Sequence, residues 1–181
     1  GAAHTINATL SLGSATLIAS SYDPNTAATK EIGTAAYRFS GVRVTAGSTE
    51  KVRLWSVRWY QSGSAASGDL SNVKTYVDGA AYDTTISSDG KYYTTLFPGG
   101  ILIDKGASKD VWVTGDIVGA SSANRTVQFD LYKTTDIYMT GETYGYGLTA
   151  SANGNCATTA TTGTEFMYSS GSCAGTASTP W

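Results

Sequence analysis

Apolar and polar residues alternate along most of this chain of 181 residues. In residues 5–12, the apolar side chains Ile6, Ala8, Leu10 and Leu12 fall on one face, and Thr, Asn and Ser occupy the other. A period of two residues is typical of a β-strand with one buried face. The pattern therefore predicts a half-buried strand near the N-terminus.

Short segments of the same kind recur along the chain and are separated by turn residues. Asp78-Gly79 and Asp89-Gly90 predict hairpin turns, Gly41 predicts a bend or bulge within its strand, and Pro98-Gly99-Gly100 predicts the end of a strand. The predicted strands are residues 15–19, 37–44, 52–60, 72–77, 80–86, 91–97, 101–103, 111–118, 125–133, 136–140 and 143–150.

In two of these predicted strands, we considered which side chains point toward the core. In residues 52–60 both phases are apolar, so the strand is either covered on both faces or carries a bulge near Trp55 that resets its phase. In residues 125–133 we expect Val127, Phe129 and Leu131 to point inward. Gln128, Asp130 and Tyr132 are expected to point outward.

No segment shows the spacing of three and four residues that marks an amphipathic helix. Many short strands separated by frequent turns predict an all-β fold, an antiparallel β-sandwich of immunoglobulin-like or jelly-roll type. We expect one sandwich domain over residues 1–149, of which residues 1–20 form an N-terminal strand region. Residues 150–181 form a Thr/Gly-rich tail.

The composition narrows the classes of function. Charged residues make up 14% of the chain, against about 25% in an average globular protein. With a net charge of −2 and no basic cluster, the chain lacks the signature of a nucleic-acid binder. No apolar run approaches the roughly 18 residues of a membrane helix, so no membrane insertion is expected. Few charges with abundant Thr, Ser, Gly and Tyr favour an exported protein, extracellular or at the cell surface.

The two cysteines, Cys156 and Cys173, lie close together near the C-terminus. In an exported protein the simplest interpretation is one disulfide that closes a short loop. A metal site would need further ligands, and the single histidine, His4, lies at the opposite end of the chain. A C-x-x-C redox motif is absent from the sequence.

The sequence nominates no catalytic apparatus, and we expect the protein not to be an enzyme. A Ser/His/Asp triad would depend on His4, and no pair of carboxylates stands out as glycosidase residues. No cofactor is expected. Loop aspartates would suit a structural Ca²⁺ ion between loops or subunits, but the sequence nominates no ligands.

Aromatic residues and sequons offer sites for glycans. Trp55, Trp59 and Tyr60 would form a sugar-binding platform if one phase of their strand were exposed, whereas burial in the sandwich core is the favoured interpretation. The sequons beginning at Asn7 and Asn124 are candidate glycosylation sites. Residues Tyr138, Tyr144 and Tyr146 are interpreted as packing or interface residues.

The central part of the chain resembles a known group of proteins. The segments "RFSGVRVTAGSTEKVRLWSVRWYQSGSAASGDLSNVKTYVDG", "SSDGKYYTTL", "GILIDKGASKDVWVTGDIVG" and "RTVQFDLY" follow one another within residues 37–132. This series is similar to β-sandwich repeats in surface-layer and other cell-surface proteins of uncultivated bacteria. The same architecture occurs in biofilm-fibre and cannula-type filament subunits. The Cys-bearing tail departs from the repeats.

The resemblance implies a structural or adhesive role and no catalytic residues. Such filament subunits polymerise by donating a terminal strand to a neighbour, and some require calcium. We therefore expect a self-assembling subunit of an extracellular filament, pilus-like fibre or surface lattice, with residues 5–12 as the candidate donor strand. The alternatives are that residues 5–12 are the first strand of their own sandwich, and that the protein is an adhesin or carbohydrate-binding module that binds surface glycans.

Overall fold

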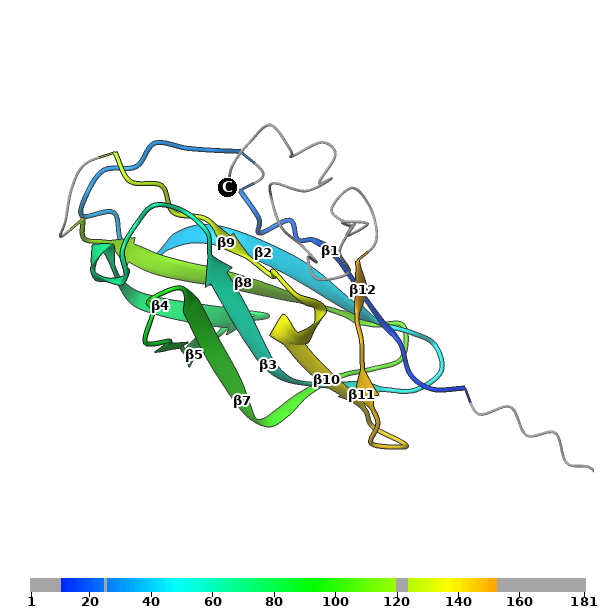
Figure 1. Ribbon diagram of the computed structural model, residues 1–181. Coiled ribbons are helices and arrows are strands. Elements are labelled where there is room, and N and C mark those ends of the chain that lie inside the picture. Colours follow the sequence, from blue (N-terminus) through cyan, green and yellow to red (C-terminus); the bar gives the residue numbers. More distant parts are fainter. Residues whose placement is uncertain (1–10, 25, 120–123, 153–181) are drawn as a thin grey trace, which may run out of the picture.

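The computed structural model describes residues 11–24, 26–119 and 124–152. These residues form two six-stranded sheets that pack face to face, as Figure 1 shows. Nearly all neighbouring strands are antiparallel, and the pair β1–β12 is parallel. The all-β antiparallel sandwich predicted from the sequence is confirmed.

The first sheet, sheet A, has the strand order β12-β1-β2-β8-β4-β5. One face of this sheet packs on the core. Its outer face is covered at the centre, because residues 39–42 of β2 and 111–115 of β8 are buried on both faces. The strands are β1 (Ala15–Ala19), β2 (Tyr37–Ala46), β4 (Leu70–Val77), β5 (Ala80–Asp83), β8 (Ser108–Ile117) and β12 (Ser151–Ala152).

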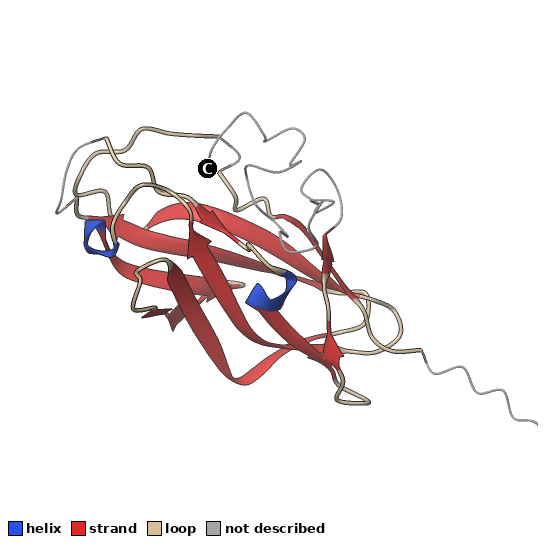
Figure 2. Cartoon of the chain, viewed as in Figure 1, coloured by secondary structure: helices blue, strands red, loops and turns tan. Residues whose placement is uncertain are grey.

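The second sheet, sheet B, has the strand order β11-β10-β3-β7-β6, and β9 pairs with the end of β3. Its strands are β3 (Val52–Gln61), β6 (Thr85–Ile86), β7 (Tyr92–Ile103), β9 (Phe129–Asp130), β10 (Ile137–Gly141) and β11 (Gly147–Leu148). In the described residues the only helical segments are the 3-10 turns Ser67–Asp69 and Thr134–Asp136 (Figure 2).

Both predicted Asp-Gly turns are hairpin turns. Val77 pairs with Ala80, and the intervening Asp78 and Gly79 have φ angles of 47° and 92°. Positive φ at both central residues matches the right-handed twist of the flanking strands. Asp89 and Gly90 lie in the longer turn that joins β6 to β7, where Gly90 has a φ of 72°.

A bulge in β3 explains why both alternating sets of side chains in residues 52–60 are apolar. Leu54 pairs with Ile101 whereas Ser56 pairs with Leu96, so Trp55 alone lies opposite residues 97–100 of β7. Before the bulge Val52 and Leu54 point inward, and after it Val57 and Trp59 do. The predicted phase reset near Trp55 is therefore confirmed.

The prediction that Pro98-Gly99-Gly100 ends a strand is wrong. β7 continues through these residues because they form the wide side of the same bulge. Gly99 and Gly100 have φ angles of 75° and 68°, which glycine adopts without steric cost. A Cβ atom on Gly100 would lie 2.5 Å from Cγ of Arg53, so the two strands approach too closely there for a side chain.

The predicted strand over residues 125–133 is much shorter in the structure. Only Phe129–Asp130 pair with β3, because the N-terminal part of the segment hydrogen-bonds to a loop. The N–H of Ala65 donates to the carbonyl of Thr126. Asp130, predicted to point to solvent, is 3% exposed and accepts a hydrogen bond from Ser62 Oγ at 2.5 Å.

Gly41 serves close packing and does not mark a bend. The register shift in β2 lies between Arg38 and Ser40, whereas Gly41 pairs regularly with Trp112. A Cβ on Gly41 would lie 3.2 Å from the backbone nitrogen of Asp23. The backbone of the turn after β1 therefore rests directly on this strand.

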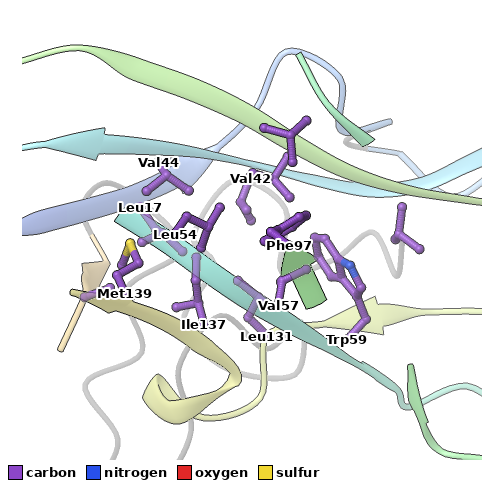
Figure 3. Packing of buried hydrophobic residues seen from close by; sticks show 14 of the residues in the cluster. Leu17, Val42, Val44, Leu54, Val57, Trp59, Phe97, Leu131, Ile137 and Met139 are labelled. Atoms are coloured by element: carbon purple, nitrogen blue, oxygen red, sulfur yellow. The ribbon is translucent and has the colours of Figure 1, made fainter. Parts of the chain in front are cut away.

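The core lies between the two sheets and draws on nearly every strand. Figure 3 shows side chains from both sheets meeting there, among them Leu17, Val42 and Val44 of sheet A and Leu54, Val57 and Trp59 of sheet B. Trp59 is fully buried, and its Nε1–H donates to Thr75 Oγ1 at 3.0 Å. The indole N–H thus has a partner, as a buried indole requires.

Candidate functional site

A short segment, residues 147–152, closes the side of the sandwich between β10 and β1. We call it the strap. β11, its first part, pairs antiparallel with β10, and β12, its last part, pairs parallel with β1 (Figure 1). Ala150, between these strands, is 3% exposed, and the flanking Leu148 and Ala152 pack against the core. The strap therefore bridges the edges of the two sheets.

The strap is held by few backbone pairs. Met139 and Thr140 of β10 pair with Leu148 and Gly147, and two further pairs join β12 to β1. By contrast, the pairing of β2 with β8 extends along almost the whole of both strands. The predicted domain boundary between residues 149 and 150 falls inside the strap, so the sandwich extends to at least Ala152 and does not end at residue 149.

A buried carboxylate, Glu50, joins three segments beside the strap. Its Oε1 accepts a hydrogen bond from the N–H of Gly13 at 2.7 Å, and its Oε2 accepts from the N–H of Thr143 at 2.8 Å and of Tyr144 at 3.4 Å. Glu50 is 2% exposed, and a Cβ on Gly141 would lie 2.3 Å from its Oε1. We call this arrangement the Glu50 clasp.

The hydrogen bonds of the clasp keep Glu50 ionised. Burial on its own raises the pKa of the Glu50 carboxyl, because it disfavours the charged form. The backbone N–H groups of Thr143, Gly13 and Tyr144 outweigh this effect and hold the pKa below its ordinary value. The clasp is therefore an anionic group that three backbone donors stabilise.

The clasp lies where the chain enters the sandwich. β1 begins at Ala15, and neither Gly13 nor Ser14 has a positive φ. The favoured two-residue hairpin turns contain at least one left-handed residue, so Gly13 and Ser14 do not form such a turn onto β1. Leu12 is 45% exposed and lies outside any strand, whereas Ile6, Ala8 and Leu10 lie outside the described residues.

The three aromatic residues proposed as a sugar platform do not share a face. Trp59 points into the core. Trp55 lies on the outer face of sheet B, where its Nε1–H donates to Thr140 Oγ1 at 2.8 Å. Tyr60 also points outward but lies beyond Arg58, nearer the other end of β3. A platform of Trp55, Trp59 and Tyr60 is therefore excluded.

Tyr60 belongs instead to a different group of rings, which we call the tyrosine cluster: Tyr60, Tyr92 and Tyr132. The Tyr60 ring centroid lies 5.0 Å from that of Tyr92 and 5.1 Å from that of Tyr132. The Arg58 guanidinium lies over the Tyr92 ring, 4.7 Å from its centroid, and its Nε–H donates to buried Asp136 at 2.7 Å. Burial, with the nearby charge of Asp136, raises the pKa of the Tyr92 phenol.

The remaining tyrosines singled out by the sequence are exposed. Tyr138 of β10 is 52% exposed, and Tyr144 and Tyr146, in the turn between β10 and β11, are 50% and 56% exposed. They therefore do not pack in the core of this chain. Their role as interface residues stays a prediction.

The candidate modification sites fall partly within the described residues. Asn124 is exposed and has a φ of 64°, a left-handed conformation that Asn tolerates better than most residues. The hydroxyl of Thr126, the third residue of the sequon, accepts a hydrogen bond from the N–H of Ser64 at 3.0 Å. Asn7, Cys156 and Cys173 lie outside the described residues.

Within residues 11–24, 26–119 and 124–152, no three His, Cys, Asp or Glu side chains are grouped so that they could hold a metal ion. The same ranges contain no helix with the length and apolarity needed to span a membrane. Calcium binding stays a prediction without ligands.

Comparisons with known proteins find a structural neighbour among solved structures but no relative in sequence. No protein-family model and no curated protein matches the chain. A solved structure described as BslA, a bacterial hydrophobin, aligns over 81% of this chain and 99% of its own with 16% sequence identity and a TM-score of 0.31. The two chains overlap loosely in space, and no residue role is transferred from that protein to this one.

Of the two features that define this site, sequence reasoning missed the buried Glu50 and found only part of the strap. Glu50 follows Ser and Thr in a polar connection between strands, and such residues are usually solvated. The adjacent apolar run of β3 gives no sign that the carboxylate before it is buried. The predicted strand over residues 143–150 contains β11, whereas β12 falls in the segment predicted to be the tail, because Thr and Gly dominate the residues after Ala150.

Proposed function

We propose that this protein is a structural subunit of an extracellular filament, pilus-like fibre or surface lattice, and that it assembles by donating residues 5–12 to a neighbouring copy. The observation that carries the proposal is the geometry at Gly13. The chain is fixed there by Glu50, and Gly13 and Ser14 do not form a favoured two-residue hairpin turn onto β1. Residues 5–12, which have the pattern of a strand, thus lead directly into Gly13, where Glu50 anchors the chain.

The pattern of residues 5–12 supports the donation. Ile6, Ala8, Leu10 and Leu12 give one apolar face, and a free apolar strand gains both backbone hydrogen bonds and side-chain burial when it joins another sheet. Leu12, the one member of this face within the described residues, is exposed. The pattern predicts that Leu12 is buried, but its own chain does not bury it.

Head-to-tail donation favours a polymer over a closed dimer. Each copy would give a strand at one site and receive one at another, and such a heterologous contact continues indefinitely unless the rotation between copies closes a ring. The resemblance to surface-layer repeats and filament subunits supports the same role, as does the low content of charged residues.

The test compares assembly of three forms of the full chain by electron microscopy, with and without Ca²⁺. The variant Ile6→Asp/Leu10→Asp places two charges on the apolar face. The control Asn7→Asp/Thr9→Asp places two charges on the polar face of the same segment. We expect fibres or lattices from the unmodified chain and the control, and folded monomers from Ile6→Asp/Leu10→Asp.

Two results would contradict the proposal. One is an unmodified chain that stays monomeric at all concentrations in both conditions. The other is an Ile6→Asp/Leu10→Asp variant that unfolds as a monomer, because residues 5–12 would then be the first strand of their own sandwich. Circular dichroism and size-exclusion chromatography distinguish this unfolding from a mere loss of assembly.

A second candidate function is carbohydrate binding at the tyrosine cluster. The observation that favours it is the grouping of three partly exposed rings beside the Arg58 guanidinium, because sugars bind at aromatic faces bordered by polar groups. Affinity electrophoresis in polysaccharide gels tests it. Binding should be lost in Tyr60→Ala and kept in Tyr138→Ala; equal retardation of both variants and the unmodified chain would exclude this site.

A further inference from the structure

We infer that the site receiving the donated strand is the groove between β10 and β1, which the strap fills in the isolated chain. This inference rests on the proposed function and adds the acceptor, the direction and the register of the donated strand. The floor of the groove contains Met139 of β10 and Leu17 of β1, both fully buried, which Figure 3 shows at the same end of the core.

The strap and the candidate donor strand share one pattern. In the strap, Leu148, Ala150 and Ala152 alternate with Thr149 and Ser151, and all three apolar residues contact or enter the core. In the donor segment, Ile6, Ala8 and Leu10 alternate with Asn7 and Thr9. A side chain placed at every second residue reaches the same face of a sheet, so either segment can present its apolar side to the groove.

The donor segment fits the groove with more apolar surface than the strap does. If Ile6 takes the place of Leu148, then Ala8 takes that of Ala150 and Leu10 that of Ala152. The exchange keeps the first two positions similar in size and replaces a partly buried alanine with leucine at the third. Leu12 extends the apolar face by one more position beyond the strap's last described residue.

The pairing of the strap also fixes the direction of the donated strand. A segment that runs antiparallel to β10 and parallel to β1 satisfies both edges at once, and the strap does so. A donated strand that follows the same course places Ile6 beside Met139 and Leu10 beside Leu17 of the receiving copy, because Leu148 pairs with Met139 and Ala152 with Leu17.

Among the described strands, the other sheet edges are poorer acceptors for a donated strand. The free edge of β7 beyond Thr94 contains Pro98, which has no N–H, and the left-handed Gly99 and Gly100, which interrupt a regular ladder. β5, the far edge of sheet A, is four residues long, and most of its side chains are exposed. Neither edge has both a regular row of backbone hydrogen-bonding groups and buried apolar side chains beneath it.

The experiment is photo-crosslinking within assemblies grown from an equal mixture of ¹⁴N- and ¹⁵N-labelled full chains. A p-benzoylphenylalanine residue replaces Ile6 in one preparation and Leu10 in another, and mass spectrometry identifies the linked peptides. A third preparation carries the probe at Thr9, on the polar face, as a control. Links between differently labelled peptides can only join two copies.

We expect the probe at residue 6 to link mainly to β10 and the probe at residue 10 mainly to β1, in both cases between differently labelled copies. The probe at Thr9 should give at least tenfold fewer links to these strands. Mixed-label links to β5 or β7, or the reversed pairing of probes and strands, would overturn the inferred acceptor but leave strand donation standing. Links confined to identically labelled peptides would overturn donation itself.

Discussion

Glu50 accepts a hydrogen bond from the backbone of Gly13 at 2.7 Å, across 37 positions of sequence. The same carboxylate accepts from Thr143, so one buried side chain fixes the entry of β1 relative to the turn that precedes the strap. A single charged group thereby holds the residues before β1 and the turn before the strap together. The first two predictions test how much the Glu50 clasp stabilises the fold.

Glu50→Gln should destabilise the fold. The glutamine amide keeps one acceptor but replaces the other with an N–H₂ group that faces backbone donors. Losing a buried hydrogen bond to a charged acceptor costs about 2 kcal/mol, so we expect a loss of that size in the free energy of unfolding, measured by urea denaturation. Glu142→Gln is the matched control, since Glu142 pairs with Arg53 at the surface and should cost clearly less. Equal losses from both substitutions would contradict the clasp.

The clasp should also shape the dependence of stability on pH. Because the pKa of Glu50 in the folded state lies below its ordinary value of 4.5, its contribution is complete above that value. It is lost as the pH falls through the folded-state pKa. The difference in unfolding free energy between the unmodified chain and Glu50→Gln should therefore be constant near neutral pH and shrink in acid. Thermal melts of both proteins from about pH 7 to about pH 3 measure this difference in stability. A difference that grows as the pH falls would contradict the prediction.

The bulge in β3 assigns opposite environments to two tryptophans four residues apart. Trp59→Ala should cost about 3–5 kcal/mol of unfolding free energy, because it empties the core and leaves Thr75 Oγ1 without its indole donor. Trp55→Ala should cost markedly less, since Trp55 lies on the outer face. Urea denaturation of both variants measures the contrast, and comparable losses would show that both rings are structural.

The two glycines of the β7 bulge should differ in their tolerance of alanine. Gly99→Ala introduces a Cβ with nothing within 4 Å, so it incurs only the cost of a left-handed backbone, about 1 kcal/mol. Gly100→Ala incurs the same backbone cost and also forces the new Cβ against Arg53. The second variant should therefore have the lower melting temperature. The reverse order would indicate that the two strands separate more easily at Arg53 than this packing implies.

Strand periodicity and turn chemistry account for most of the fold. The Asp78-Gly79 hairpin, the strand at Ala15–Ala19 and the phase reset at Trp55 all follow from local rules, because each depends on a few neighbouring residues. The prediction failed at Pro98, where the partner strand carries the matching bulge. No rule applied to one strand reveals what its neighbour does.

The candidate site was predictable only in part. The alternation of residues 5–12 identifies a candidate donor strand, but the acceptor depends on which edges remain accessible, and that is a property of the assembled sheets. Glu50 and Asp130 are buried because distant backbone and side-chain donors surround them. Their own sequence neighbourhoods, like those of most carboxylates, indicate exposure.

The order in which sheet A is completed gives the strap a further significance. β2 must wait for β8, since Tyr37 pairs with Gly115, and such long-range pairings form slowly. The strap lies still later in the chain, so during synthesis it is the last described element to become available. Until the strap has folded, the edges of β1 and β10 that it pairs with are left without a partner unless another segment binds there. If a strand from another copy binds in the groove, as proposed, it competes with the chain's own strap, and the folding rate of the C-terminal strands then affects which of the two binds first.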